Sequence, residues 1–309
     1  MTRPSEQIIN RLMELKQNPS ILFMPYKYAM FDCMEPVYLE AKNKGLRASI
    51  TVIPYQSFPD MKWHDEVKSF EQENFSTVFF DELAFRNYDF IVIHYPYNGG
   101  NNVTMIHPAA WTSKLHDIVY IPYHGNLAGK EWARFFTTPG AMECDYICLG
   151  SENDKEWFLE KNPGCEEKII ETKGSTKAEC AEFHKNDPIP AEFEKLDHPV
   201  ALVSGTLWTF THDCCGRIKK HLNVIEKAQK DGFTVIYRPH PLVRDAIAVM
   251  DPQNLQKYDD FLEKVAEKCI LDGSPYLHHV LRVADRLISD PSSVLKTWQG
   301  TGKPYEVIE

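Results

Sequence analysis

The chain has 309 residues, of which 43% are hydrophobic and 25% are charged, a composition that is ordinary for a soluble globular protein. This length predicts one large domain or two of medium size. The formal net charge of -10 argues against binding of nucleic acids or anionic membranes through bulk charge. Any anionic ligand would therefore have to be bound by local groups.

The first stretch, MTRPSEQIINRLMELKQNPS, predicts a helix with one polar face and not a signal peptide. The longest apolar runs have the length of strands, so we expect no transmembrane segment and a cytoplasmic protein. The eight cysteines are scattered and include no C-x-x-C pair. This spacing suits neither a zinc ribbon nor a disulfide framework, and it favours reduced thiols.

Short runs rich in Ile, Val, Tyr and Phe alternate along the chain with longer amphipathic stretches. This alternation predicts the α/β class, with parallel sheets covered by helices on both faces. The runs span residues 20–26, 47–55, 88–97, 117–125 and 145–151 in the first half, and 198–206, 233–241, 285–293 and 303–309 in the second. Helices are expected at Met34–Lys44, Ser151–Lys161, Arg217–Asp231 and Tyr258–Lys268.

One polar segment with three prolines, Ala181–Pro199, separates two such series and is predicted to be an interdomain linker. We therefore expect two Rossmann-like domains, residues 1–185 and 186–309, that face each other across a central cleft. In open parallel sheets the functional loops lie at the carboxyl ends of the strands. Residues directly after the apolar runs are thus the candidates for a site.

In the first half, two histidines follow apolar runs. His124 follows the predicted strand Ile118–Tyr123, and Gly125 lets the backbone turn sharply and approach a ligand. A histidine in this position can act as a general base or can hydrogen-bond a loop carbonyl, and spacing does not decide between the two. His94 occupies the corresponding position after an earlier run and is expected to line the cleft.

In the second half, two small polar turns follow apolar runs. Ser204 to Thr206 is rich in donors and suited to an anion, but it lacks the glycine spacing of a P-loop or a dinucleotide fingerprint. The predicted strand Arg286–Ser289 ends at Asp290, and Ser292 or Ser293 can cap the helix that follows. Such a helix start also offers free N–H groups to a phosphate, although capping alone explains the serines.

The stretch TVIYRPHPLVRD, Thr234–Asp245, holds His240 between two prolines at the end of a predicted strand. Because each proline lacks an N–H and pushes the residue before it toward an extended conformation, a helix is disfavoured here. Arg238 and Arg244 add local positive charge, and arginine prefers bidentate contact with phosphate or carboxylate. A surface salt bridge is the alternative for each arginine.

A metal site built on His94, His124 and His240 is a weaker interpretation, since no H-x-H or H-E-x-x-H spacing is present. We therefore expect no metal and no cofactor. His278 and His279 lie in a stretch with helical spacing and are expected to be structural or to face solvent.

The order of these motifs resembles that of the CDP-glycerol glycerophosphotransferase family, the teichoic acid primases and polymerases. The motifs are the His-Gly turn in YHGN, followed by YICLGSENDKEWF, TKGSTKAE, YRPHPLVRD and ADRLISDPSSVLKTW. The resemblance extends from Tyr120 to the end of the chain. It implies a two-domain fold like that of the GT-B glycosyltransferases.

Position by position, this resemblance implies roles for the candidate residues. His124 would be the catalytic base, and His240 would contact the donor diphosphate, with Arg238 at the basic position before it. The pair Ser292–Ser293 would bind phosphate at a helix start, in a turn that Asp290 shapes.

The implied reaction is transfer of glycerol phosphate from CDP-glycerol to an acceptor hydroxyl, with release of CMP. The partners would be a cytidine nucleotide donor and a polyol-phosphate or glycan acceptor, and not a nucleic acid. The chain stops at Glu309, directly after its last predicted strand, where family members continue with helices. The second domain is therefore expected to be incomplete, and peripheral contact with the inner membrane face would need a partner or a missing domain.

Other interpretations stay open. A His-Pro motif with a Ser-Ser pair also resembles that of bacterial capsule transferases that use CMP-activated acidic sugars. The chain could instead be a catalytically idle nucleotide-binding module, since Pro291 stands where the family has an aromatic residue. A metal-dependent hydrolase on the three histidines would require bound zinc or manganese.

Overall fold

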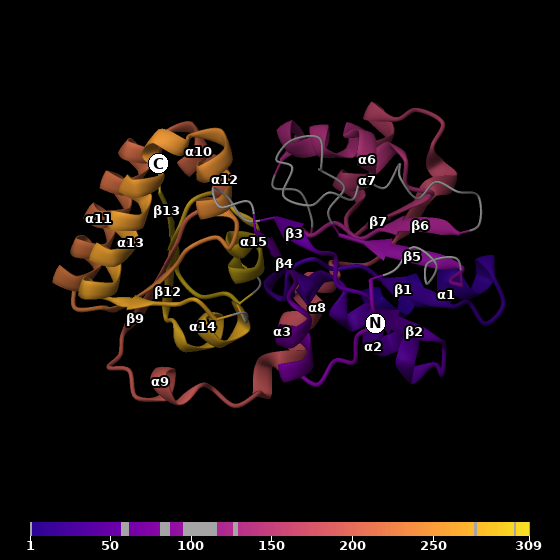
Figure 1. Ribbon diagram of the computed structural model, residues 1–309, viewed down its shortest axis with the longest axis horizontal. Helices are drawn as coiled ribbons and strands as arrows, with labels where there is room; N and C mark the ends of the chain where they lie inside the picture. Colours follow the sequence, from indigo (N-terminus) through magenta and orange to yellow (C-terminus); the bar gives the residue numbers. More distant parts are fainter. Residues whose placement is uncertain are drawn as a thin grey trace. The chain divides into compact units, whose positions relative to one another are not determined.

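The computed structural model describes residues 2–56, 62–80, 87–94, 116–125, 129–274, 277–299 and 301–308, without the side chains of residues 131, 132 and 296. These residues form two compact units, one that runs to Phe183 and one that begins at His184 (Figure 1). Each unit is built on a parallel sheet with helices packed against it, so the predicted α/β class is confirmed. No helix in the described ranges is long and apolar enough to cross a membrane.

The first unit contains a six-stranded sheet in the order β2-β1-β5-β6-β7-β8, in which every pair is parallel. The chain adds β2 on one side of β1 and β5 on the other, so the switch point of this sheet lies between β1 and β5. The short β3 and β4 form a separate antiparallel hairpin. The strands are β1 Ile21–Phe23, β2 Ala48–Ile50, β3 Tyr55–Gln56, β4 Trp63–His64, β5 Phe90–Ile93, β6 Asp117–Tyr120, β7 Tyr146–Leu149 and β8 Ile169–Glu171.

Helices lie on both sides of this sheet, with α6 and α7 on one side and α1, α2 and α8 on the other (Figure 1). Strands covered in this way bury both faces, which explains why β1 and β5 read as unbroken apolar runs. The helical segments are α1 Pro4–Leu15, η1 Tyr28–Cys33, α2 Glu35–Asn43, α3 Val67–Gln72, η3 Lys130–Thr137, α6 Pro139–Met142, α7 Glu152–Lys161, η4 Glu166–Lys168 and α8 Thr176–Phe183.

One buried carboxylate joins the first and last helices of this unit. Glu179 on α8 accepts hydrogen bonds from the Ser5 backbone N–H at 2.9 Å and from Ser5 Oγ at 2.6 Å, in the first turn of α1. The first turn of a helix has unpaired N–H groups and a partial positive charge, so a carboxylate is stabilising there. Through this contact α8 is held against α1.

The second unit contains a five-stranded parallel sheet in the order β11-β10-β9-β12-β13. Here the order of strands reverses between β9 and β12, which is the switch point of this sheet. All five residues of β9 are buried. The strands are β9 Val200–Ser204, β10 Thr234–Arg238, β11 Ile270–Leu271, β12 Arg286–Ser289 and β13 Tyr305–Val307.

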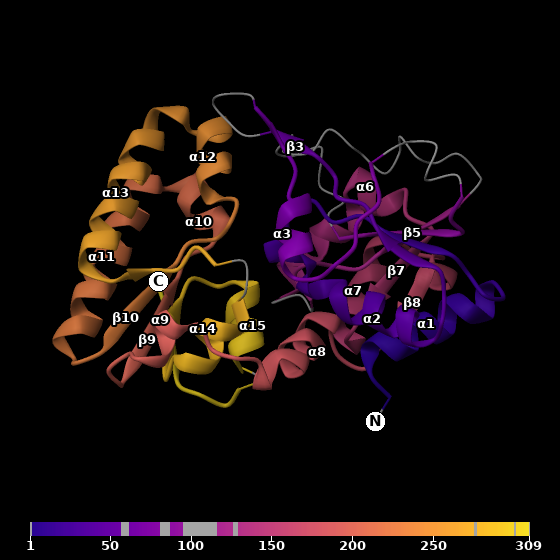
Figure 2. The ribbon, with the colours of Figure 1, turned by 60° about the horizontal axis from the view of Figure 1, so that its bottom comes forward.

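Alternate residues of these strands supply two cores, one on each face of the second sheet. Ala201 and Val203 pack with α11, α12 and α13, whereas Val200 and Leu202 pack with α9, α14 and α15. Figure 2 shows α11 and α13 on one side of the sheet and α14 and α15 on the other. The helical segments are η5 His184–Asn186, α9 Ala191–Glu194, α10 Leu207–His212, α11 Cys214–Lys230, α12 Val243–Met250, η6 Pro252–Asn254, α13 Leu255–Lys268, α14 Leu277–Val283 and α15 Ser293–Gln299.

The predicted linker, Ala181–Pro199, is largely structured. Its first residues complete α8 in the first unit, and the two units divide between Phe183 and His184. The rest belongs to the second unit, where α9 buries Phe193 in the core. Ile189 and Leu196, on either side of α9, pack against the same core, so the prolines and polar residues of this segment are compatible with a packed structure.

The glycine after β9 is required by close packing. A β-carbon at Gly205 would lie 2.6 Å from the ring of Phe210 and 3.0 Å from His221, and both of these side chains are buried. We expect Gly205→Ala to lower the free energy of unfolding by about 1–3 kcal/mol, the usual effect of overpacking a core. Gly273→Ala is the matched control, since a β-carbon added there would meet nothing within 4 Å. Urea denaturation should show a loss for Gly205→Ala only; equal midpoints for the two variants would contradict this packing.

The Glu179 contact gives a second prediction. Glu179→Ala should lower the free energy of unfolding by about 1–3 kcal/mol, because it leaves Ser5 donors buried without an acceptor. Glu171→Ala, which removes an exposed carboxylate paired with Lys155, should change it by less than about 1 kcal/mol. Thermal unfolding of the two variants measures the difference, and similar melting temperatures would show that Glu179 is not an anchor.

Candidate functional site

In the second unit, three strands end side by side at one edge of the sheet. Arg238, the last residue of β10, and Ser289, the last of β12, are both in register with Ser204 at the end of β9. The loops that follow these ends carry the remaining candidates from the sequence of this unit, namely Thr206, His240, Asp290, Ser292 and Ser293. This edge includes the switch point, the position at which open α/β sheets bind ligands.

Asp290 is fully buried and connects the segments around this edge. Its Oδ2 accepts hydrogen bonds from the Thr206 N–H at 2.9 Å and from Thr209 Oγ1 at 2.6 Å, and its Oδ1 accepts one from Arg217 at 2.9 Å. His221 Nε2 lies 3.4 Å from Oδ2. Burial alone would raise the pKa of Asp290, but His221 and the two threonine donors hold it below its ordinary value. Asp290 is therefore a carboxylate that fixes the loops around it.

Arg238 is buried and has partners within its own unit. Its Nη1 donates hydrogen bonds to Asp272 Oδ2 and, at 3.3 Å, to Ser274 Oγ. The carboxylate of Asp272 offsets the charge of the guanidinium, so the electrostatic attraction of Arg238 for a phosphate is weaker. Arg244 makes two hydrogen bonds to Asp259, of 2.8 and 2.9 Å, which is the salt bridge that the sequence left as an alternative.

The ring orientation of His240 bears on its role. Its Nδ1 accepts a hydrogen bond from the Leu242 N–H at 3.2 Å. When Nδ1 is an acceptor, the proton of the neutral imidazole is on Nε2. This tautomer can donate from Nε2 but cannot remove a proton there. The geometry therefore suits contact with a phosphate oxygen better than general base catalysis.

Ser292 and Ser293 lie at the start of α15. Ser292 Oγ accepts a hydrogen bond from the Leu295 N–H at 3.3 Å, and it lies 3.2 Å from Ser289 Oγ. Ser292 thus caps the helix, which is the simpler of the two roles that the sequence allows. Ser293 is the first residue of the helix. A phosphate contact by either serine stays a prediction.

In the first unit, His94 comes directly after β5, beside the switch point. Its side chain is 1% exposed, and its ring stacks on Tyr26, which follows β1, with centroids 5.2 Å apart. The ring of Tyr123 lies edge-on to it at 6.3 Å. Neither ring nitrogen of His94 has a hydrogen-bond partner among the residues described. Burial of polar atoms without partners is unfavourable, so this imidazole is a candidate for ligand contact.

His124 lies in the turn after β6. Gly125 beside it has a φ of 66°, which favours glycine, and a β-carbon there would crowd Ser175 Oγ at 3.2 Å. The His124 ring lies 6.2 Å from that of Phe135 and 6.4 Å from that of Phe136. Its side chain is partly exposed, but its two ring nitrogens are buried. The last residue of the YHGN motif, at position 126, lies outside the described residues.

His94 and His124 are both uncharged at neutral pH. Burial lowers the pKa of His94 to about 3 and that of His124 to about 4, and the positive charge of Lys177 acts in the same direction on both. At His124 the Gly125 backbone opposes this lowering. An uncharged imidazole can accept a proton, which a general base must do. His124 is thus in the correct protonation state for its predicted role.

Lys177 was not among the residues predicted for a site. It lies on α8 with 5% of its side chain exposed, and its Nζ is 2.7 Å from Asp32 Oδ2. The same Nζ lies 4.1 Å from the centroid of the Tyr123 ring. Burial alone would lower the pKa of Lys177, but Asp32 and Tyr123 raise it above its ordinary value. A lysine with a raised pKa in a largely buried ion pair, close to a buried histidine, is a candidate for a functional site.

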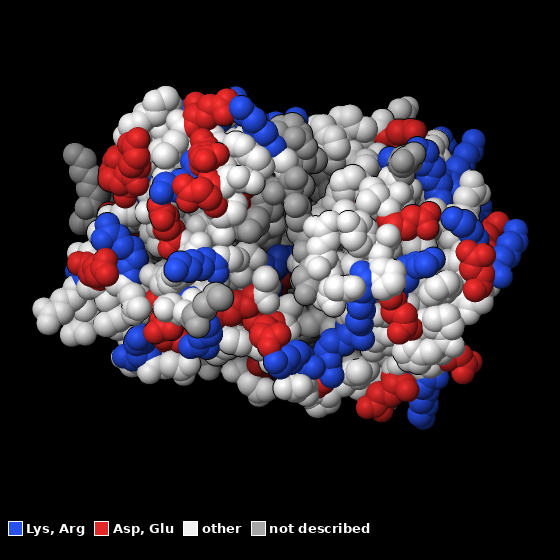
Figure 3. Space-filling view, turned by 180° about the vertical axis from the view of Figure 1, so that it is seen from behind, with Lys and Arg blue, Asp and Glu red and all other residues white. Residues whose placement is uncertain are grey.

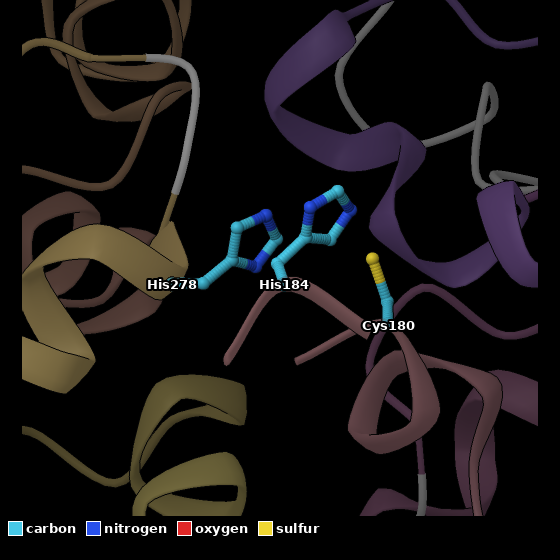
Figure 4. Close-up of side chains that lie close together, drawn as sticks. All are labelled: Cys180, His184 and His278. Atoms are coloured by element: carbon cyan, nitrogen blue, oxygen red, sulfur yellow. The ribbon is translucent and has the colours of Figure 1, made fainter. Parts of the chain in front are cut away.

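Two further histidines form a pair in the second unit. His278 on α14 and His184 in η5 stack face to face, with centroids 4.3 Å apart and planes 6° apart (Figure 4). His184 Nδ1 lies 2.5 Å from Asp187 Oδ2. Cys180, also labelled in Figure 4, belongs to the first unit. The buried position of His278 fits the expectation that it is structural.

The charged side chains on the surface are of mixed sign. On the face that Figure 3 shows, lysines and arginines lie interspersed with aspartates and glutamates. On that face, anion binding therefore depends on individual groups and not on a broad basic area, as far as the described residues extend.

No protein-family model and no curated protein matches the chain. Solved structures do match. They include a UDP-N-acetylglucosamine 2-epimerase from Listeria monocytogenes, with a TM-score of 0.63 and 14% identity over 94% of this chain and 78% of the other. The Methanocaldococcus jannaschii UDP-GlcNAc 2-epimerase, in complex with UDP-GlcNAc and UDP, has a TM-score of 0.59 and 14% identity over 90% and 80%.

The wall teichoic acid polymerase TagF also matches, with a TM-score of 0.52 and 14% identity over 98% of this chain and 74% of that chain. Identities this low establish a shared fold and not a shared activity. The chain therefore has the GT-B-like α/β fold that its sequence predicted.

Proposed function

We propose that this chain is a transferase that moves a polyol phosphate from a cytidine diphosphate-linked donor to an acceptor hydroxyl and releases CMP. Glycerol phosphate is the group that we favour. The observation that carries the proposal is the in-register ending of β9, β10 and β12 at a switch point, with a histidine and hydroxyl side chains in the loops that follow. The ordered motifs and the shared fold with TagF support it.

On the donor side, the second unit supplies the contacts. His240 donates from Nε2 to an oxygen of the diphosphate, and Ser292–Ser293 and the turn from Ser204 to Thr206 bind the remaining oxygens. Asp290 keeps these loops in place through its hydrogen bonds and does not itself meet the ligand. Arg238 acts together with Asp272, since the two are paired.

On the acceptor side, His124 is the base. It removes the proton of the acceptor hydroxyl while that oxygen bonds to the β-phosphorus of the donor. The bond between the β-phosphorus and the bridging oxygen breaks, and CMP leaves with that oxygen. The scheme uses no metal and no cofactor, so proton transfer and positioning by side chains account for the catalysis.

Substitution of the two histidines tests these roles. We expect His124→Ala to lower kcat for CMP release from CDP-glycerol by about 10²–10⁴-fold, the usual contribution of a general base. His240→Ala should lower it by about 10²–10³-fold, as loss of a donor to the developing charge does. His212→Ala is the control, since this exposed histidine bonds the Trp208 carbonyl and packs on its ring within α10. Unchanged turnover in both site variants would refute the assignment.

A donor screen tests the substrate class. The purified chain should release nucleotide from CDP-glycerol faster than from CDP-ribitol, CMP-activated acidic sugars or UDP-sugars when acceptors are supplied. Preference for a CMP-sugar would support the capsule transferase alternative. Calorimetry that shows CDP binding without turnover of any donor would support the idle module, and absence of binding to every cytidine nucleotide would contradict the proposal.

The low pKa of His124 predicts the acid limb of the pH profile. A base must be unprotonated, so kcat/KM should stay level as the pH falls from 7 to 5 and should drop only toward pH 4, where His124 gains its proton. An unperturbed histidine would instead produce a limb near pH 6.5. The pH dependence of kcat/KM for CDP-glycerol measures this, and a limb near pH 6.5 would exclude His124 as the base in this environment.

A further inference from the structure

The segments that follow β1, β5, β6 and β8 bring polar side chains together at the switch-point edge of the first sheet. Asp32 lies in η1, which follows β1, and His94 comes directly after β5. Tyr123 lies in the turn after β6, and Lys177 lies on α8, which follows β8. Lys177 Nζ is 2.7 Å from Asp32 and 4.1 Å from the Tyr123 ring, and that ring in turn lies against His94. These residues form one cluster within one unit.

The cluster holds polar atoms that have no partner within the described ranges. Asp32 uses Oδ2 for Lys177, whereas its Oδ1 is buried and makes no hydrogen bond to any described residue. His94 likewise makes none through either ring nitrogen in the described part of the chain. A buried carboxylate oxygen and a buried imidazole without hydrogen bonds are unfavourable unless another group, such as a ligand, forms hydrogen bonds with them. Together they offer two acceptors and one donor.

The charge of the cluster indicates which kind of ligand group it can bind. Lys177 and Asp32 cancel, and His94 is uncharged, so the cluster has no net positive charge with which to hold a phosphate. A carboxylate oxygen as the free acceptor also repels an anion and accepts readily from a hydroxyl. Two apolar residues of similar volume would often be as stable as a buried ion pair or more so, which favours a functional reason for this one.

We propose that Asp32, His94 and Lys177 form a subsite that binds the hydroxyl groups of an uncharged polyol. One hydroxyl donates to Asp32 Oδ1, and a second hydroxyl pairs with His94. Lys177 acts as a positioning residue, since it holds the other oxygen of Asp32. This subsite would bind the acceptor of the proposed transferase. The proposal of a polyol subsite rests on that function only for the identity of the acceptor.

Glycerol is the probe for this subsite, and its binding is measured by saturation-transfer NMR on the full chain. The double variant Asp32→Leu/Lys177→Met removes both charges together, so neither is left buried alone. His94→Phe keeps a ring to stack on Tyr26 and removes both nitrogens. Glu179→Gln is the matched control, because it weakens a buried contact of the same helix without touching the cluster.

We expect glycerol to bind the unaltered chain in the millimolar range and to bind the double variant and His94→Phe at least about tenfold more weakly, as loss of a hydrogen bond to a charged or buried group implies. Glu179→Gln should bind it as the unaltered chain does. Inorganic phosphate at the same concentration should not displace it. Melting curves for each variant establish that it is folded.

The proposal is overturned if glycerol does not bind the unaltered chain, if it binds the variants equally well, or if phosphate displaces it. Calorimetry with CDP on the same samples separates this from the proposed function, because the donor contacts lie in the second unit. Loss of glycerol binding in the double variant and in His94→Phe, with CDP binding intact, supports both the polyol subsite and the proposed transferase. A chain that binds glycerol through this cluster but binds no cytidine nucleotide would retain the subsite and refute the transferase.

Discussion

The organisation of this protein depends on one constraint: parallel strands covered by helices on both faces leave no room for polar groups along their length. The central strands β1, β5 and β9 are buried at every residue. Groups that could carry chemistry are therefore confined to the edges of the sheets, and the switch points open those edges to ligands. For this reason the candidate residues of both units lie at strand ends or in the loops and helix starts that follow them.

Each unit has a carboxylate at its switch-point edge, fully buried at Asp290 and partly buried at Asp32, but the two are bonded in different ways. In the second unit Asp290 receives hydrogen bonds on both oxygens, so its role is to hold loops for other groups. In the first unit Asp32 is bonded through one oxygen only and leaves the other without a partner among the described residues. A buried polar atom without a hydrogen-bond partner is unfavourable. The fully bonded Asp290 therefore fits a structural role, whereas the open oxygen of Asp32 fits contact with a ligand.

Much of the fold could be predicted because its signals are local. Every predicted apolar run contains a strand, whereas β4, β8 and β11 were missed because they are short and flanked by polar residues. The candidate histidines could be found because each lies at a strand end or within four residues of one. The Lys177–Asp32 pair and the contact of His221 with Asp290 could not, since these residues are far apart in the sequence and meet only when the segments that carry them pack together. The ion pair of Arg238 with Asp272 was hidden for the same reason.

The central claim is that the edge formed by β9, β10 and β12 binds the cytidine nucleotide. Hydrogen–deuterium exchange with and without saturating CDP tests it most directly, because loop amides exchange slowly once a ligand holds them. We expect protection of the segments 204–206, 238–243 and 289–295, with the amides of α11 and α13 unchanged. Absence of protection in these three segments, or protection confined to the first unit, would contradict it.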